Sequence, residues 1–337
     1  MLMSKYNNIE KYIKSLDKSK IKEILLYKDS DQQNLFQLAR DIRDNGKFGK
    51  KVELRSVIET SNICKQNCKY CSMGNNPKNL YVLPKETILS RIKNLADIGR
   101  RTFLIQSGEN KNQKYIDDIA YCCSEAVKLY PDIRLILCLG NLEKEQYIQL
   151  KESGASRYIL KFETSNSEHH KFIRPSDTIE NRLNCIKNLI EIGFQTGSGN
   201  IVGLPNQTLD NLVEDLILIN ELNLSMVSAT KFIPNEFSEF KDYPSGDIDL
   251  TLNFLAILRI LKPNCLIPST TSLSTGSENG QINGLKAGCN TITIHDGTPK
   301  EYEKDFSIYS EKRFSPAEEY CRNIIKQADL VPVNFLL

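Results

Sequence analysis

The chain has 337 residues and is 40% hydrophobic, which is enough for one large domain or two modest ones with a substantial core. The formal net charge is only +2, and residues of both signs are spread throughout, which argues against a nucleic-acid partner. No apolar stretch reaches membrane-spanning length, and residues 1–50 hold no secretion signal, so we expect a cytoplasmic protein without membrane contact.

Apolar, strand-like runs alternate with amphipathic helical patterns from residue 51 onward. The expected strands are residues 52–59, 102–107, 133–139, 157–162, 194–202, 226–233, 265–270 and 291–295. Clear helical patterns cover residues 85–98, 211–222 and 249–261. Residues 1–48 are polar and helical in pattern, and predict an N-terminal helical cap. Residues 49–337 are then expected to form one barrel domain with a C-terminal helical extension.

This alternation predicts an α/β fold, because strands separated by helices pair in parallel. Eight such strands predict a (β/α)8 barrel of the TIM type, and a doubly wound open sheet is the alternative. In a barrel of this kind the chemistry lies where the strands end and the following loops begin. Residues that come directly after the expected strands are therefore the candidates for a functional site.

Three cysteines, Cys64, Cys68 and Cys71, follow the first expected strand in a CxxxCxxC pattern. Clustered thiolates favour soft metals, and three of them can hold three irons of a 4Fe–4S cube and leave the fourth iron open. Structural zinc more often uses two separated ligand pairs, and a disulfide would leave one cysteine unpaired. The loop therefore predicts an open-site 4Fe–4S cluster, with zinc or inert thiols as the alternatives.

The cysteine loop, with Tyr70 just before its last cysteine, resembles the signature of the radical S-adenosylmethionine (SAM) enzymes. The resemblance implies that SAM binds the open iron through its amino and carboxylate groups. It also implies that reduction of the cluster cleaves SAM to methionine and a 5′-deoxyadenosyl radical, which abstracts hydrogen from the substrate. Tyr70 is then expected near the adenine, and a flavodoxin- or ferredoxin-type protein is expected as the reductant.

Two further segments resemble SAM-binding parts of the family. Ser107, Gly108 and Glu109 close the second strand and resemble the GE motif, which implies a contact with the SAM ammonium; a plain turn is the alternative. Glu163 ends the fourth strand, and Arg182 lies on the following helix. The resemblance makes both SAM contacts, with Arg182 suited to the carboxylate. For Arg182 the alternative is an ion pair on a helix surface.

The fifth expected strand is rich in glycine, which marks close backbone approach. Gly199, Ile201 and Gly203 resemble the family's adenine-side motif GxIxGxxE. The match departs from the motif at Asn206, where the family has a carboxylate. The departure weakens the implied role of this one position.

Within the superfamily the resemblance is to the group of biotin synthase, the [FeFe]-hydrogenase maturase HydE and the methylornithine synthase PylB. It covers residues 30–310 and includes residues 58–64, 106–109, 180–185 and 201–208. The expected substrate half departs from HydE, since Lys161 replaces an arginine. The candidate substrate residues are Lys161, Thr270, Thr271 and His295, because they lie at strand ends. The substrate is expected to be small or bound to a carrier, and packing is the alternative for His295.

Sulfur insertion of the biotin or lipoyl synthase type is the first specific expectation, and it requires a second Fe–S cluster. Cys138 lies near one such biotin synthase ligand, but the partner positions are not cysteine. Cys265, Cys289 and Cys321 are other candidate ligands, although core packing is favoured for them. The alternatives are a HydE-like maturase, a PylB-like mutase and a non-enzymatic Fe–S or zinc scaffold. The pair at residues 169–170, both histidines, is expected to face solvent.

Overall fold

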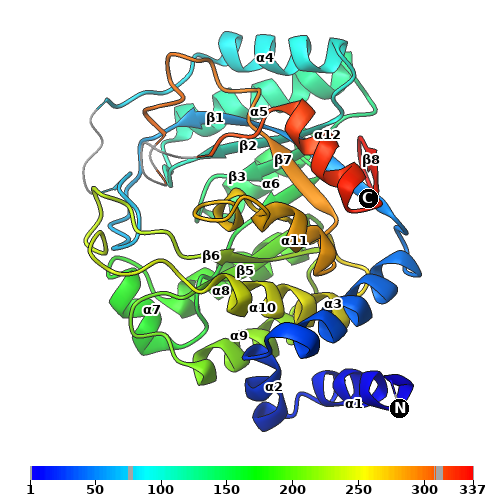
Figure 1. The fold of residues 1–337 in the computed structure, drawn as a ribbon. Helices are drawn as coiled ribbons and strands as arrows, with labels where there is room; N and C mark the ends of the chain where they lie inside the picture. The colour runs from blue at the N-terminus through cyan, green and yellow to red at the C-terminus, as the bar shows by residue number, and fades with distance from the viewer. Residues whose placement is uncertain (1, 75–78, 307, 309–313, 337) are drawn as a thin grey trace.

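The computed structural model describes residues 2–74, 79–306, 308 and 314–336. Three helices precede the first strand: α1 (Leu2–Lys14), α2 (Lys18–Leu25) and α3 (Asp29–Asp44). The helices α1 and α3 pack against α10 (Ile248–Leu261), so the N-terminal segment lies against the outside of the helical layer (Figure 1). None of the described helices is long and apolar enough to cross a membrane.

Parallel strands form one sheet in the middle of the molecule (Figure 1). They are β1 (Lys51–Ser61), β2 (Thr102–Ser107), β3 (Arg134–Cys138), β4 (Arg157–Ile159), β5 (Gln195–Val202), β6 (Met226–Lys231), β7 (Thr291–Ile294) and β8 (Val331–Val333). Their order is β6-β5-β4-β3-β2-β1-β7, and β8 pairs with the beginning of β1. The order never reverses between β1 and β6, as it would in a doubly wound sheet. The predicted α/β class with parallel strands is therefore confirmed.

Residues 265–270 do not form the predicted seventh strand. Leu266 makes one isolated parallel bridge to Met226 of β6, and Pro268 makes one to Thr291 of β7. Proline has no N–H group with which to continue a ladder. The two bridges still join β6 to β7, so the curved sheet keeps the barrel-like architecture. The short strand β8 was not predicted, because three residues are too few to show a period.

Helices follow the strands and cover the outside of the sheet (Figure 1). They are α4 (Lys85–Asp97), α5 (Gln113–Leu129), α6 (Lys144–Glu152), α7 (Ser167–Ile173), α8 (Ile179–Glu191), α9 (Leu209–Glu221), α11 (Gly280–Lys286), α12 (Glu318–Gln327) and the 3-10 turn η1 (Thr271–Leu273). Local capping sets their ends: Thr178 caps α8 and Asp247 caps α10 through side-chain oxygens. Gly154 and Gly193, just past α6 and α8, have φ of +98° and +88°, which suits glycine.

A buried charged cluster closes the floor of the barrel. Arg157 of β4 is fully buried and donates to both carboxylate oxygens of Glu53 on β1, at 2.9 and 3.0 Å. Arg55 donates to Glu53 Oε1 at 2.7 Å.

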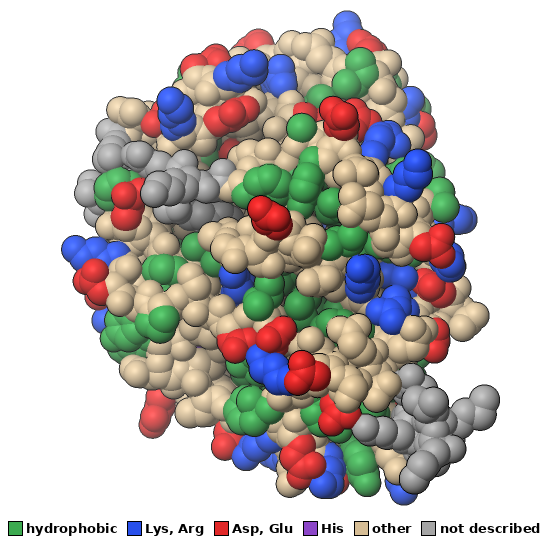
Figure 2. All heavy atoms as spheres, viewed as in Figure 1, with side chains coloured by type: hydrophobic (Ala, Val, Ile, Leu, Met, Phe, Trp, Pro, Cys, Tyr) green, Lys and Arg blue, Asp and Glu red, His purple; other side chains and the backbone are tan. Residues whose placement is uncertain are grey.

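The outer surface in Figure 2 is a mixture of cationic and anionic side chains without a broad patch of either sign. The functional residues therefore have to be sought at the other end, where the strands run out into loops.

Candidate active site

The cysteine loop after β1 is tied to two neighbouring loops. The backbone N–H of Lys65 donates to Glu109 O, and that of Lys69 donates to Ile173 O, both at 2.9 Å. The N–H of Glu109 donates to Cys64 Sγ at 3.4 Å. These bonds join the loop to the turn after β2 and to the end of α7. These bonds thus hold the loop in position against its neighbours.

The thiols of this loop fit an iron–sulfur cluster. Cys68 is buried, and Cys64 and Cys71 are half-buried. Burial raises the pKa of Cys68 and of Cys71, and a metal that binds these thiols displaces their protons. Among the described residues no three His, Cys, Asp or Glu converge as they would around a single ion. Three thiols on one short loop can each bind a different iron of one cube.

Gly108 allows the turn after β2 to come close to this loop. A Cβ at this position would lie 2.4 Å from Ile63 O and 2.8 Å from Cys64 Cβ. Ser107, beside it, donates its hydroxyl to Gly108 O at 2.8 Å and is buried within the same turn. The glycine is therefore required sterically by the approach of the two loops.

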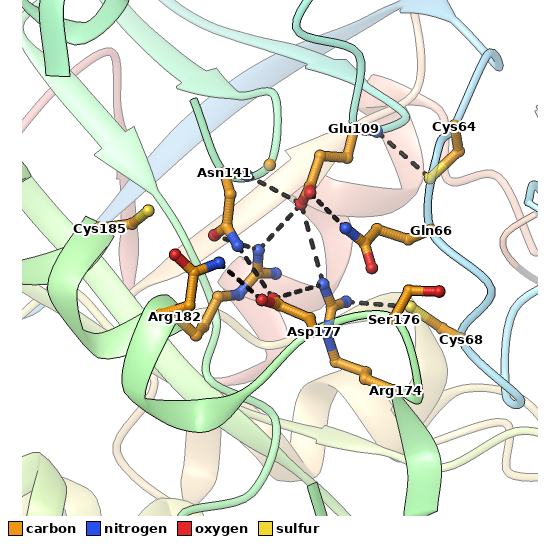
Figure 3. A network of polar contacts seen from close by, with 12 residues as sticks. Cys64, Gln66, Cys68, Glu109, Asn141, Arg174, Ser176, Asp177, Arg182 and Cys185 are labelled. Carbon is orange, nitrogen blue, oxygen red and sulfur yellow. Dashed lines mark hydrogen bonds and ion pairs between the residues drawn. The ribbon is translucent and has the colours of Figure 1, made fainter. Parts of the chain in front are cut away.

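Glu109 is the centre of a buried polar network (Figure 3). Its Oε1 accepts a hydrogen bond from Gln66 at 2.6 Å. Its Oε2 accepts from the backbone N–H of Asn141 at 2.8 Å and from Arg182 Nη1 at 3.1 Å. Gly140, at φ +80°, makes room for this carboxylate, because a Cβ there would lie 2.4 Å from Glu109 Cγ. Residues from the loops after β1, β2 and β3 and from α8 thus meet at one carboxylate.

Arg182 reaches the site from α8 and is not on the surface. Its side chain is 5% exposed, which excludes the surface ion pair considered above. Besides Glu109, it donates to Asn141 Oδ1 at 2.7 Å and to Lys161 O at 2.8 Å. The structure thus brings Glu109 and Arg182, 73 residues apart, into a buried ion pair.

Glu163 has an unusual backbone conformation, with φ +69°. Such a conformation in a residue other than glycine is strained and is common at functional sites. It is held by β5, since Glu163 N–H donates to Gly199 O and Ile201 N–H donates to Glu163 O, both at 3.0 Å. The carboxylate forms an ion pair with Lys161 at 2.8 Å. Lys161 also donates to Thr230 Oγ1 at 3.2 Å.

The glycines of β5 have a packing role. A Cβ on Gly199 would lie 1.9 Å from Ser228 O on β6, and one on Gly203 would lie 2.3 Å from Gly246 Cα. Gly203 also has φ +89°. Asn206 has φ +63° and ends the same turn. These residues let the backbone of β5 and its loop pack closely against the neighbouring chain.

Eight of the expected site residues line adjoining cavities at this end of the barrel. Tyr70, Lys161, Glu163, Arg182 and Ile201 line one cavity of about 190 Å³. A second cavity of about 150 Å³ is lined by Thr270, Thr271 and His295. Both cavities include Gln106, so the expected SAM side and substrate side adjoin.

Some residues of the site were missed or misread in the sequence. Arg174, just after α7, is 4% exposed and donates to Cys68 Sγ at 3.0 Å. Only its place in a loop at the catalytic end could have indicated it. The two histidines expected at the surface are buried: His169 is within 2.9 Å of Pro205 O, and His170 is fully buried. That expectation is wrong because α7 packs this face inward.

The remaining cysteines do not gather into a second ligand group in the part of the chain that the structure describes. Cys265, Cys289 and Cys321 are buried in the hydrophobic core. The thiol of Cys265 faces Leu224 O at 3.1 Å. Cys138, by contrast, lines the 190 Å³ cavity, where burial raises its pKa to about 11.

Comparison with known proteins agrees with this geometry. Residues 58–219 match the model of the radical SAM superfamily. The [FeFe] hydrogenase maturase subunit HydE of Thermotoga maritima is 37% identical over 295 residues, which are 87% of this chain and 83% of that protein. A biotin synthase of Anoxybacillus flavithermus is 33% identical over 281 residues, which are 79% of this chain and 83% of the synthase.

The crystal structure of methylornithine synthase (PylB) superposes with a TM-score of 0.82 at 20% identity, and covers 96% of this chain and 97% of PylB. The chain therefore belongs to the radical SAM superfamily, within the group of HydE, PylB and biotin synthase. It is an enzyme, and its family uses a 4Fe–4S cluster and SAM.

Proposed function

We propose that this enzyme is a HydE-like maturase that acts in the assembly of an [FeFe] hydrogenase. The observation that carries the proposal is the 37% identity to HydE over 87% of the chain. Biotin-type sulfur insertion, our first expectation, is supported less well by the relatives. It needs a second cluster, but of the candidate ligands Cys138, Cys265, Cys289 and Cys321 only Cys138 lines a cavity described above, while the other three lie in the core. The maturase reading needs only the ligands of the cysteine loop.

In this proposal Cys64, Cys68 and Cys71 hold the 4Fe–4S cluster. The cluster and SAM together supply an organic radical that can abstract hydrogen from carbon, while the protein orients the reactants and excludes water. Arg182 is placed to take the SAM carboxylate, because its guanidinium can bind a carboxylate through two parallel hydrogen bonds. When it does so, Asn141 and Gln66 remain as hydrogen-bond donors to Glu109.

On the SAM side, Glu109 would bind the SAM ammonium and Glu163 would contact SAM. Tyr70 and Ile201 provide the apolar wall for the adenine, since both line the same cavity. Lys161, beside Glu163, marks the boundary with the substrate side. A cytoplasmic location and a flavodoxin- or ferredoxin-type reductant belong to the same proposal. So does the division of the chain into an N-terminal helical cap, residues 1–48, and a barrel domain with a C-terminal helical extension, residues 49–337.

Substrate recognition is assigned to Lys161, Thr270, Thr271 and His295. The ammonium of Lys161 supplies positive charge, and the threonine hydroxyls can donate or accept hydrogen bonds. Thr270 Oγ1 lies 2.9 Å from Ser272 Oγ, so this hydroxyl has a defined orientation. A small anionic substrate fits such a set.

Two measurements test the proposal. Iron and sulfide are counted after anaerobic reconstitution, in the wild type and in a variant with Cys64, Cys68 and Cys71 all changed to alanine. We expect about four irons per chain, all lost in the variant. Iron that remains in the variant would reveal an auxiliary cluster and favour sulfur insertion.

The second measurement is activation of an [FeFe] hydrogenase in an extract that contains the other maturation proteins but no HydE. We expect this chain to restore hydrogen evolution and Cys68→Ala to fail. If the wild type carries an active cluster but restores no hydrogen evolution, the maturase proposal is refuted.

A further inference from the structure

The guanidinium of Arg174 lies directly against a sulfur of the cysteine loop (Figure 3). Its Nη1 donates to Cys68 Sγ at 3.0 Å and to Tyr70 Oη at 3.4 Å. The side chain is 4% exposed, so little water screens the contact. A cation and a hydrogen-bond donor are thus held at one cluster ligand.

This contact is held in place by neighbouring groups. Arg174 Nη2 donates to Asp177 Oδ2 at 3.3 Å and lies 3.8 Å from Glu109 Oε2. Asp177 is itself fixed by Asn141 Nδ2 at 2.9 Å. The bond from Lys69 N–H to Ile173 O ties the cysteine loop to the residue that precedes Arg174. The arginine and the sulfur therefore keep their relative position.

One donor of Arg174 is left over. Its Nε is buried and has no hydrogen-bond partner among the described residues. A buried donor without a partner is costly, so such a group indicates a place for an acceptor. The sulfides of a cluster bound at the neighbouring thiols are acceptors of this kind.

We propose that Arg174 sets the reduction potential of the iron–sulfur cluster by donating a hydrogen bond and positive charge to the Cys68 sulfur. The inference rests on the cluster assignment made under the proposed function. Reduction adds one electron to the cluster and so makes it more negative. Hydrogen bonds to the sulfurs and nearby positive charge stabilise the more negative state, and raise the potential. Arg174 thus makes the electron that starts the reaction easier to deliver.

Arg174→Gln removes the charge. We expect the ratio of reduced to oxidised cluster, at a fixed potential, to fall at least tenfold, which is a drop of about 59 mV for one electron. Arg174→Lys keeps the charge without the planar fork. It is expected to give a potential between those of Arg174→Gln and the wild type. Arg174 is a tuning residue in this proposal, and the midpoint potential is a readout that a merely structural role would not move.

Lys171→Gln is the matched control. Lys171 lies three residues before Arg174, is exposed, and donates to Pro175 O. The substitution therefore removes one positive charge, as Arg174→Gln does, without removing a contact to a cluster ligand. We expect its midpoint potential to equal that of the wild type. An equal fall in Lys171→Gln and Arg174→Gln would overturn the proposal, because it would make the effect one of general charge.

The potentials are measured by redox titration followed by electron paramagnetic resonance on the full, anaerobically reconstituted chain. Iron content and circular dichroism are measured for each variant. An Arg174→Gln protein with full iron and the wild-type potential overturns the proposal. If neither Arg174 variant takes up iron, the proposal is also overturned, since the residue then serves assembly.

The same experiment separates this proposal from the one on which it rests. A wild type without a 4Fe–4S signal refutes the cluster assignment itself. A signal that is lost in the triple cysteine variant, but has the same potential in Arg174→Gln, refutes only the role of Arg174.

Discussion

Asp215 and His170 are expected to make opposite contributions to the pH dependence of the free energy of unfolding, and these contributions nearly cancel in the wild type. Asp215, on α9, is fully buried, and its Oδ1 accepts from Ser165 N–H and Oγ–H, each at 2.6 Å. Its Oδ2 accepts from Asn200 Nδ2 at 2.7 Å. The carboxyl group therefore holds the turn that contains Glu163 against β5. Burial raises the pKa of Asp215 from 3.8 to about 6.

The sign follows from the direction of that shift. A carboxyl whose pKa is raised in the folded protein favours folding when protonated, so its contribution is present below pH 4 and is lost as the pH rises through 6. A shift of about two units corresponds to about 3 kcal/mol. For His170, burial lowers the pKa from 6.5 to about 4. Its contribution is therefore present above pH 6.5 and is lost as the pH falls toward 4, by about 3 kcal/mol.

The two terms nearly cancel between pH 6.5 and 4, and a single substitution exposes the other. In Asp215→Asn only the histidine remains, so the free energy of unfolding should fall by about 3 kcal/mol over this range, relative to the wild type. The new amide can bond Asn200, whose Oδ1 has no partner among the described residues. In the converse variant, His170→Phe, only the aspartate remains. Its free energy of unfolding should therefore rise by about 3 kcal/mol relative to the wild type as the pH falls from 6.5 to 4.

The measurement is urea unfolding of the metal-free chain, followed by circular dichroism at pH 4, 5, 6 and 7.5. Other titrating groups are common to all variants, so their contributions cancel in the difference from the wild type. If Asp215→Asn and the wild type have parallel pH profiles, Asp215 does not titrate in this range and the reasoning is wrong.

Three further substitutions test the site. Cys68→Ala should abolish 5′-deoxyadenosine formation, measured by chromatography, and leave the circular dichroism unchanged. Lys161→Ala should still form 5′-deoxyadenosine but lose hydrogenase activation; loss of SAM binding would show that the division between the two sides is misplaced. Gly140→Ala should weaken SAM binding at least tenfold in calorimetry, because its Cβ would displace Glu109. Gly193→Ala is its control, since it has a similar positive φ and open space around it, and equal SAM affinities in the two variants would contradict this reason.

The short-range features could be predicted because their causes are local. The run at 102–107 is predicted as a strand and observed as β2 with the same bounds. Gly193 ends α8 with a positive φ, as its place after the helical pattern indicates. The failure at residues 265–270 has a local reason too, but one that an apolar pattern hides, since Pro268 interrupts the ladder.

The candidate site was predictable only in part. The thiols of Cys64, Cys68 and Cys71 are close in the sequence, so their spacing already indicates a shared ligand. Arg182 could be named from a family resemblance, but its burial and its pairing with Glu109 depend on how α8 packs against the turn after β2.

The sequence by itself determined the alternation of strands and helices, the cysteine loop and the family, because each depends on residues that are neighbours in the chain. Only the tertiary structure placed Arg174 against Cys68, 106 residues away, and turned His169 and His170 inward. Such contacts depend on the directions in which side chains of separate segments point, and the hydrophobic periodicity of the sequence does not indicate these directions. The residues that bind the cluster can thus be recognised within one short segment of the sequence, whereas the residues that contact those ligands from other segments are fixed only by tertiary packing.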